Sequence, residues 1–192
     1  MQDISIDKHT TALVVIDLQK GIVSMPAEPH ATETIISNAV KLASAFRSHD
    51  MPVFLVHVGP SADAKDGLRP LSDQPMMLRH PMPPDWAEII TELGPAKTDF
   101  VIRKRQWGAF YGTELDLQLR RRKIETIVLC GISTNIGVES TARFAYEYGY
   151  QQIFAEDACG ARSKDEHRLS METIFPRMGR VRKTQAILAS LS

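Results

Sequence analysis

The chain has 192 residues, of which 43% are hydrophobic and 24% are charged, a composition typical of a folded globular domain. Its 23 basic and 23 acidic residues balance, so no overall field attracts nucleic acid or an anionic membrane. It shows no apolar run of bilayer length, no signal-peptide pattern and, with two cysteines, no disulfide framework. We therefore expect one cytoplasmic domain over residues 1–192, without nucleic-acid or membrane partners.

The first half of the chain predicts one β-α-β unit. Residues 11–17 form an apolar, β-branched run that ends in Asp17, which is typical of a buried strand. Apolar residues recur at helical spacing over residues 31–50, and residues 52–58 form a second apolar run. Two strands that flank a helix in this way predict a parallel pair joined by a crossover.

Residues 59–98 interrupt this alternation. Seven of the eleven prolines lie here, together with Met76, Met77, Met82 and Trp86. A connection of this length is usually a lid, a binding loop or an oligomer arm, and an irregular excursion with a small helix near Trp86 is the plainer alternative. Because the Met and Pro content also suits a subunit interface, we expect a homo-oligomer.

The second half of the chain returns to alternating strands and helices. Strands are predicted at residues 99–103, 126–130, 152–156 and, more briefly, 180–182. Helices are predicted from Thr113, after the turn at 131–137, over 164–175 and over 184–191. Ser133, Thr134 or Asn135 is expected to cap the helix that follows the turn. This order predicts an α/β fold with a mostly parallel sheet covered on both faces.

Polar features follow three of the predicted strands. Asp17 ends the first, Lys104 directly follows the third, and the turn at 131–137 follows the central one. In a doubly wound sheet these places converge on one crevice. An acid beside an amine can hold or exchange protons there. The plainer alternative is a structural ion pair, or a turn residue and a solvated lysine.

Three blocks of the sequence carry a family resemblance. They are VVIDLQ at residues 14–19, KRQWGAFYGTEL at 104–115 and GISTNIGVE at 131–139. In this order they resemble the isochorismatase-like hydrolases of the cysteine hydrolase superfamily, which include nicotinamidases, N-carbamoyl amidohydrolases and isochorismatases. The resemblance covers essentially the whole chain. It implies a three-layer α/β/α domain around a central six-stranded parallel sheet of Rossmann-like topology, usually in an oligomer.

The resemblance also points to a missing nucleophile. Most of the family uses an Asp–Lys–Cys triad; Asp17 and Lys104 match two members, but Gly137 stands at the position of the cysteine. A glycine has no side chain to attack an amide carbonyl, so the covalent route is closed at this position. Cys130 is expected to be a core residue of the central strand, and Cys159 is also expected to be structural.

Some isochorismatases resemble this chain in carrying glycine at that position. Their reaction, hydrolysis of an enol ether with release of pyruvate, requires no protein nucleophile. By this resemblance Asp17 protonates the vinyl carbon, while Lys104 holds a substrate carboxylate or positions Asp17. The space at Gly137 and the N–H groups of the turn receive the enolpyruvyl group. We expect a hydrolase of a small carboxylated or cyclic metabolite, with isochorismate as the leading candidate.

The same blocks supply the residues expected to contact the substrate. These are Gln19, Trp107, Phe110, Ile132, Ser133, Thr134 and Ile136. Trp107 and Phe110 can wall an apolar slot, or can pack against the sheet edge or a neighbouring subunit. The family's isochorismatases show a Lys-Trp-Arg-Tyr-Ser-Ala-Phe-like run, in which this chain has Gly108 in place of the serine. The pocket is therefore expected to differ from theirs.

Two other functions stay open. A degenerate member of the family would bind a small metabolite or a partner in the same pocket without converting it, and an amidohydrolase would use another group as its nucleophile. No metal or other cofactor is expected. His57 lacks the nearby acid that metal-binding relatives carry after the second strand, and residues 131–137 match neither a dinucleotide nor a Walker-type phosphate loop.

Overall fold

The computed structural model describes residues 4–74 and 83–191, and its centre is a six-stranded sheet. The strands are β1 (Thr11–Ile16), β2 (Val53–Val58), β3 (Phe100–Lys104), β4 (Thr126–Ile132), β5 (Gln151–Gly160) and β6 (Arg180–Arg182). They lie in the order β3-β2-β1-β4-β5-β6, and every neighbouring pair is parallel. The predicted α/β fold with a six-stranded parallel sheet is confirmed.

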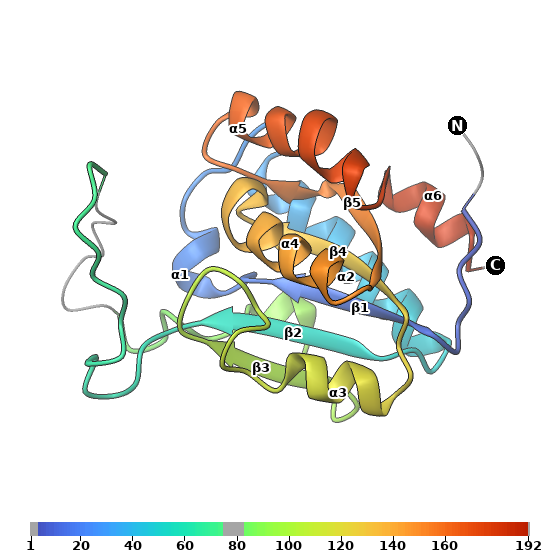
Figure 1. Cartoon of the computed structure of the whole chain (residues 1–192), viewed down its shortest axis with the longest axis horizontal. Coiled ribbons are helices and arrows are strands. Elements are labelled where there is room, and N and C mark those ends of the chain that lie inside the picture. Colours follow the sequence, from blue (N-terminus) through green and yellow to red (C-terminus); the bar gives the residue numbers. More distant parts are fainter. Residues whose placement is uncertain (1–3, 75–82, 192) are drawn as a thin grey trace.

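Helices cover both faces of the sheet (Figure 1). On one face, α2 (Thr32–Ser48) packs beside α6 (Thr184–Ala189). On the other face lie α3 (Leu115–Arg121), α4 (Glu139–Glu147) and α5 (Lys164–Arg168). All of β1 is buried, because it lies at the centre between these layers. None of the helices in the described ranges combines the length and apolarity that a bilayer crossing requires.

Several predicted boundaries differ from those observed. Strand β5 continues past Glu156 to Gly160, because the polar side chains in its middle find partners in distant elements. The helix predicted over residues 164–175 is α5 followed by a π-helical turn (Leu169–Ile174) and a short 3-10 turn (Phe175–Arg177). Glu114, not Thr113, precedes the first residue of α3, although the Thr113 hydroxyl accepts the N–H of Leu115.

The turn after β4 differs most from its prediction. Residues Thr134–Val138 form a π-helical turn that runs directly into α4, and no side chain caps either segment. The expected capping by Ser133, Thr134 or Asn135 was therefore wrong. The wider coil brings the chain from the end of the central strand into α4 and carries Gly137.

The segment over residues 59–98 has two described parts. After β2, residues 60–74 run outward beside the body of the domain, and Leu68 and Leu71 are exposed (Figure 1). Residues 83–90 return and pair with the start of α1 (Lys20–Val23), where the Trp86 ring lies against Gly21. Met76, Met77 and Met82, expected at an interface, lie outside the described residues.

Ion pairs contribute to the contact between residues 83–90 and α1. Trp86 lies in turns rather than in the predicted small helix, and the 3-10 turn of the segment comes later, at Thr91–Leu93. The Lys20 ammonium pairs with the carboxylates of Asp85 and Glu88 at 3.0 and 2.7 Å, and these side chains are largely exposed. Surface ion pairs, one aromatic contact and backbone hydrogen bonds, such as those from the N–H groups of Lys20 and Gly21 to Glu88 and Trp86, therefore hold residues 83–90 on α1.

Candidate active site

The carboxyl edge of the sheet brings together the three features that the sequence places after its strands. Asp17 follows β1, Lys104 is the last residue of β3, and Gly137 lies in the π-helical turn after β4. Lys104 Nζ donates to Asp17 Oδ2 at 2.8 Å and to the carbonyl oxygen of Trp107 at 2.5 Å. Its side chain therefore crosses the end of β2 to reach the acid beyond it.

The Asp17–Lys104 pair is buried. The side chains of Lys104 and Asp17 are 1% and 8% exposed. The second carboxylate oxygen of Asp17, Oδ1, is buried and has no hydrogen-bond partner among the described residues. Burial raises the pKa of Asp17 to about 6, against the opposing attraction of the Lys104 charge and its hydrogen bond. A carboxyl group with this pKa can carry a proton close to neutral pH.

Gly137 faces this pair directly. A Cβ atom added to Gly137 would lie 3.0 Å from Asp17 Oδ2 and 3.4 Å from Lys104 Nζ. Any side chain at this position would therefore touch both charged groups. The Thr141 hydroxyl donates to the Gly137 carbonyl at 2.7 Å, which fixes the turn onto the first part of α4. Gly137 thus presents backbone, and no side chain, to the acid and the amine.

A second glycine makes this approach possible. Gly131 has a φ of +124°, and a Cβ atom on it would lie 2.0 Å from the carbonyl oxygen of Ile16. Only glycine fits such a contact without displacing the backbone. Strand β4 can therefore lie close against the last residue of β1, which places the turn after β4 beside Asp17.

Comparison with known proteins agrees with these blocks and their geometry. Residues 11–186 match the isochorismatase domain. The chain belongs to the isochorismatase family. It is 51% identical over 188 residues to the uncharacterized isochorismatase family protein YecD of Escherichia coli O157:H7, covering 98% of this chain and 100% of YecD. It is 50% identical to the uncharacterized family protein YwoC of Bacillus subtilis, covering 98% and 97% of the two chains.

A solved structure of an isochorismatase family protein from Burkholderia thailandensis has the same fold. It superposes with a TM-score of 0.93 at 42% identity and covers 97% of each chain. This family member shares the arrangement of helices around the parallel sheet.

The other residues expected to contact the substrate have different surroundings. Gln19 is fully buried; its amide nitrogen donates to the carbonyls of Val58 and Trp86, and its oxygen accepts the N–H of Val58. Phe110 is buried against Tyr148 and Tyr150, at ring-centroid distances of 5.4 and 5.8 Å. Both side chains thus have partners within the domain.

The remaining expected contacts lie in the two loops at the edge. Trp107 is 55% exposed, while its carbonyl accepts from Lys104. Ile132 and Thr134 are buried, and Ser133 and Ile136 are half-buried. The Thr134 hydroxyl lies 2.9 Å from Nδ1 of His167. The turn therefore contacts α5 as well as the acid–amine pair.

Neither cysteine is placed to act as a nucleophile. Cys130 and Cys159 are both fully buried in strands β4 and β5. Burial raises the pKa of the Cys130 thiol to about 12 and raises that of Cys159 well above its usual value, where the nearby Cys130 adds to the effect. A thiol that stays protonated inside the core is unreactive.

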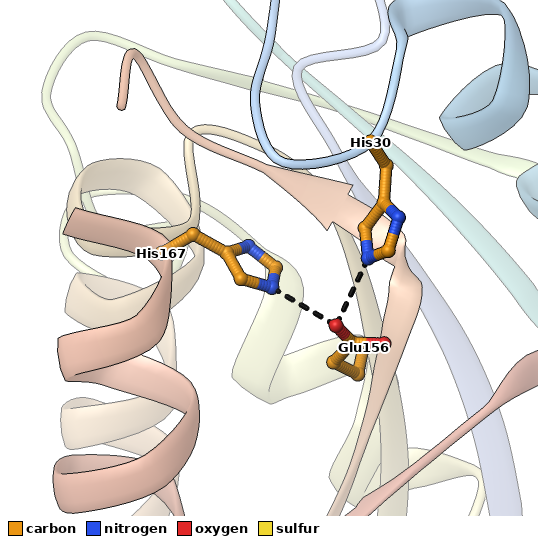
Figure 2. A group of neighbouring side chains, drawn as sticks. All are labelled: His30, Glu156 and His167. Carbon is orange, nitrogen blue, oxygen red and sulfur yellow. Dashed lines mark hydrogen bonds and ion pairs between the residues drawn. The ribbon is translucent and has the colours of Figure 1, made fainter. Parts of the chain in front are cut away.

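The structure also brings together a group that sequence reasoning missed. The side chains of His30, Glu156 and His167 converge at the same edge of the sheet (Figure 2). The only signal for it in the sequence is that Glu156 closes an apolar run. His30 lies 126 residues from Glu156 along the chain and His167 lies 11 residues from it, and these separations match no familiar metal-ligand spacing. His57, which was considered as a ligand, instead has Nδ1 2.7 Å from the Ala87 carbonyl.

Proposed function

We propose that this protein hydrolyses a small carboxylated or cyclic metabolite by general-acid chemistry, without a cysteine nucleophile. The leading candidate substrate is isochorismate, which would give pyruvate and a dihydroxycyclohexadiene carboxylate. The observation that carries the proposal is the contact geometry of Gly137: its missing side chain would touch both Asp17 and Lys104. The acid and the amine are in place, while the position beside them carries no nucleophile and leaves little room for one.

In the proposed reaction, Asp17 begins as a carboxylic acid. Its proton passes to the CH2 carbon of the enol ether, and the adjacent carbon becomes an oxocarbenium ion. Water adds to that carbon and returns one proton to the Asp17 carboxylate. In the resulting hemiketal, the bond between the central carbon and the ether oxygen breaks. The hemiketal hydroxyl loses its proton and becomes the carbonyl of pyruvate, and the ether oxygen gains a proton and stays on the ring as a hydroxyl group. Asp17 ends the cycle protonated, as it began.

Lys104 positions the acid in this scheme. Its ammonium donates to Asp17 Oδ2, so Oδ1, which has no partner among the described residues, is the oxygen available to carry the proton. The ammonium also opposes the effect of burial on the pKa of Asp17. Once Asp17 has given up its proton, the same cation stabilises the carboxylate that forms.

The alternatives differ in what they require of Gly137. An amidohydrolase would need another nucleophile, and the burial of Cys130 and Cys159 argues against either thiol. A binding protein without turnover needs no nucleophile, and the small exposed fraction of Asp17 and Lys104 suits the retention of a ligand as well as its conversion. We place the hydrolase first because a raised carboxyl pKa beside an amine serves proton transfer.

The deciding experiment measures pyruvate release from isochorismate by the wild type and by Asp17→Asn. We expect release by the wild type to decline as the pH rises above about 6, because Asp17 then loses the proton it must donate. Asp17→Asn should abolish release. Asp50→Asn is the matched control and should retain pyruvate release. Asp50 is exposed at the opposite end of the sheet, and its left-handed backbone conformation is one that asparagine tolerates.

Full turnover by Asp17→Asn would disprove the role of the acid. If no pyruvate is released at any pH, isochorismate is not the substrate, and thermal-shift screening of carboxylated metabolites separates the remaining cases. A binding protein would be stabilised by a ligand that is recovered unchanged, whereas a hydrolase would convert it.

We also propose that the protein is a homo-oligomer. Phe144 and Tyr148 of the α4 region lie 6.2 Å apart by ring centroid and are both partly exposed, and Phe144 packs against Gly108 of the loop that carries exposed Trp107. An exposed aromatic surface of this kind is typical of an interface. Light scattering should give a mass above that of one chain, and Phe144→Glu should lower it. A monomeric wild type would contradict the proposal.

A further inference from the structure

Three metal-ligating side chains from three separate elements meet beside the middle of β5. His30 lies in the loop before α2, Glu156 in β5 and His167 in α5. Nε2 of His30 lies 2.9 Å from Glu156 Oε1, and Nε2 of His167 lies 3.3 Å from the same oxygen. Figure 2 shows both rings directed at this one atom. Among residues 4–74 and 83–191, this is the one group of three His, Cys, Asp or Glu donors close enough to share an ion.

We propose that His30, Glu156 and His167 form a binding site for a divalent transition-metal ion of the Zn²⁺ type. Two imidazoles and one carboxylate are a donor set that zinc accepts, at about 2.0–2.2 Å from each donor. Donors at tetrahedral angles and this distance lie about 3.3 Å apart. The two measured separations, 2.9 and 3.3 Å, are close to that value, and all three donor atoms lie within 4.8 Å of one another.

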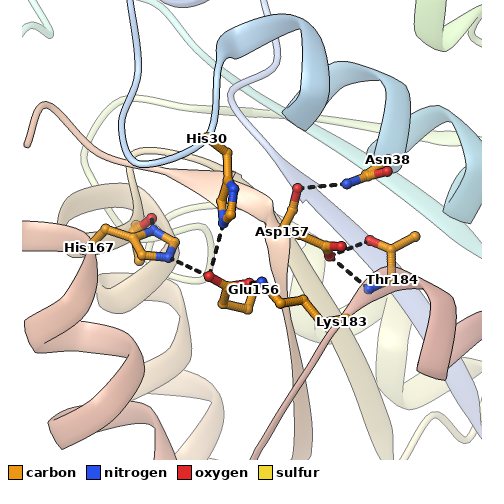
Figure 3. A network of polar contacts seen from close by, with 8 residues as sticks. His30, Asn38, Glu156, Asp157, His167, Lys183 and Thr184 are labelled. Carbon is orange, nitrogen blue, oxygen red and sulfur yellow. Dashed lines mark hydrogen bonds and ion pairs between the residues drawn. The ribbon is translucent and has the colours of Figure 1, made fainter. Parts of the chain in front are cut away.

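The surroundings hold these donors in place (Figure 3). Nδ1 of His167 lies 2.9 Å from the Thr134 hydroxyl, an outer contact of the kind that orients ligating histidines. Next to Glu156, the Asp157 carboxylate accepts from the N–H and hydroxyl of Thr184, both at 2.7 Å, and its carbonyl accepts from the Asn38 amide at 2.8 Å. Strand β5 is therefore fixed to α2 and α6 beside the donors.

Space remains for a fourth ligand. A cavity of about 290 Å³ is lined by Glu156 and His167, and also by Pro29, which precedes His30. Water or a small anion in this cavity could complete the coordination, as at zinc sites with three protein ligands. Asp17, Lys104 and Gly137 do not line the cavity. The metal site is therefore separate from the acid–amine pair, and the inference does not rest on the proposed hydrolase activity.

One cation competes with the metal. Lys183 forms an ion pair with Oε2 of Glu156, the oxygen that faces away from the histidines. The Lys183 side chain is 59% exposed, so it can move into solvent when an ion arrives. The ion must also replace any proton on Nε2 of either ring, and its affinity should therefore rise with pH.

Metal binding would restrain the turn that carries Gly137. Thr134 begins this π-helical turn, and its hydroxyl contacts the ring of His167. An ion on Nε2 of His167 would fix the ring and, through Nδ1, the hydroxyl. The structure thus offers a physical link from the metal site to the turn beside Asp17.

The test uses the full chain, stripped with a chelator and then titrated with Zn²⁺ by calorimetry. We expect one ion per chain and a rise in the melting temperature. Mg²⁺, which prefers oxygen ligands, should have no such effect. Co²⁺ should give the intense visible absorption of a tetrahedral site. His30→Gln, at a partly exposed position, should weaken Zn²⁺ binding at least about tenfold.

Two further variants make the result specific. Glu156→Gln should weaken binding to a similar degree, whereas His49→Gln, an exposed histidine at the end of α2, should bind Zn²⁺ as the wild type does. His167→Gln is a supplementary test because His167 is buried and its loss can affect folding. Failure of the wild type to bind Zn²⁺, or wild-type affinity in His30→Gln, would overturn the proposal.

Discussion

Replacing Lys104 with methionine should destabilise the protein by an amount that grows with pH. Burial raises the pKa of Asp17 to about 6 from an ordinary value of 3.8. Because the folded pKa is the higher one, stability from this group is fully present below pH 3.8 and is lost as the pH rises to about 6. In the wild type this loss is about 3 kcal/mol at neutral pH.

Without Lys104, both effects that lower the pKa of Asp17 disappear, and the acid should stay protonated in the folded state even at pH 7.5. Holding that proton would cost about 5 kcal/mol relative to the unfolded chain, which is about 2 kcal/mol more than in the wild type. At pH 5 Asp17 is largely protonated in both proteins, so the difference vanishes. Lys104→Met should therefore lose about 2 kcal/mol more stability at pH 7.5 than at pH 5.

Urea unfolding of both proteins at the two pH values measures this difference. Loss of the bond from Lys104 to the Trp107 carbonyl adds about 1 kcal/mol that does not depend on pH. Lys41→Met, on the exposed surface of α2, is the matched control and should show no pH-dependent change. An equal destabilisation by Lys104→Met at pH 5 and pH 7.5 would refute the argument, because it would mean that Asp17 does not titrate as the buried partner of Lys104.

Two further predictions concern glycines. Gly137→Cys should place a thiol against the Lys104 ammonium, after a small shift of Asp17, whose Oδ2 would lie 3.0 Å from the new Cβ. Because a nearby cation favours the reactive thiolate, iodoacetamide should label this thiol faster than Cys130 or Cys159 in the native protein, as mass spectrometry of digests would show. Labelling no faster than that of the buried cysteines would contradict this geometry. Gly131→Ala should cost about 3 kcal/mol or more in urea unfolding, because its Cβ would enter the backbone of β1. Gly149→Ala, with positive φ but open space, should cost only about 1–2 kcal/mol, and equal losses would remove the steric explanation.

The fold could be predicted because its central strands are continuous apolar runs. Strands β1 and β4 are buried on both faces, and this environment selects the β-branched residues that identified them. The end of β5 could not be predicted in the same way. Glu156 and Asp157 look like the end of a strand in the sequence, but partners from α2, α5 and α6 satisfy them within it. Such partners are set by tertiary contacts, which local patterns do not contain.

The candidate site could be predicted in part for a similar reason. Asp17 and Lys104 follow strands, so topology alone brings them to one edge, and the structure places them in direct contact. The surroundings of Phe110 depend on Tyr148 and Tyr150, which reach it from the far end of α4. The grouping of His30 with Glu156 and His167 likewise depends on three separate elements. Residue spacing predicts neither, because packing between elements determines both.

Two sets of ion pairs that involve residues of the Gly59–Lys104 region should respond differently to ionic strength. Charges in solvent are screened over about 8 Å in physiological salt, whereas buried pairs are screened much less. The contacts of Lys20 with Asp85 and Glu88 are exposed, while those of Lys104 with Asp17 are not. Concentrated salt should therefore weaken the ion-paired part of the attachment of residues 83–90 to α1, while the backbone hydrogen bonds there and the acid–amine pair stay intact. A salt titration followed by hydrogen exchange would thus report on this attachment separately from the chemistry of the site.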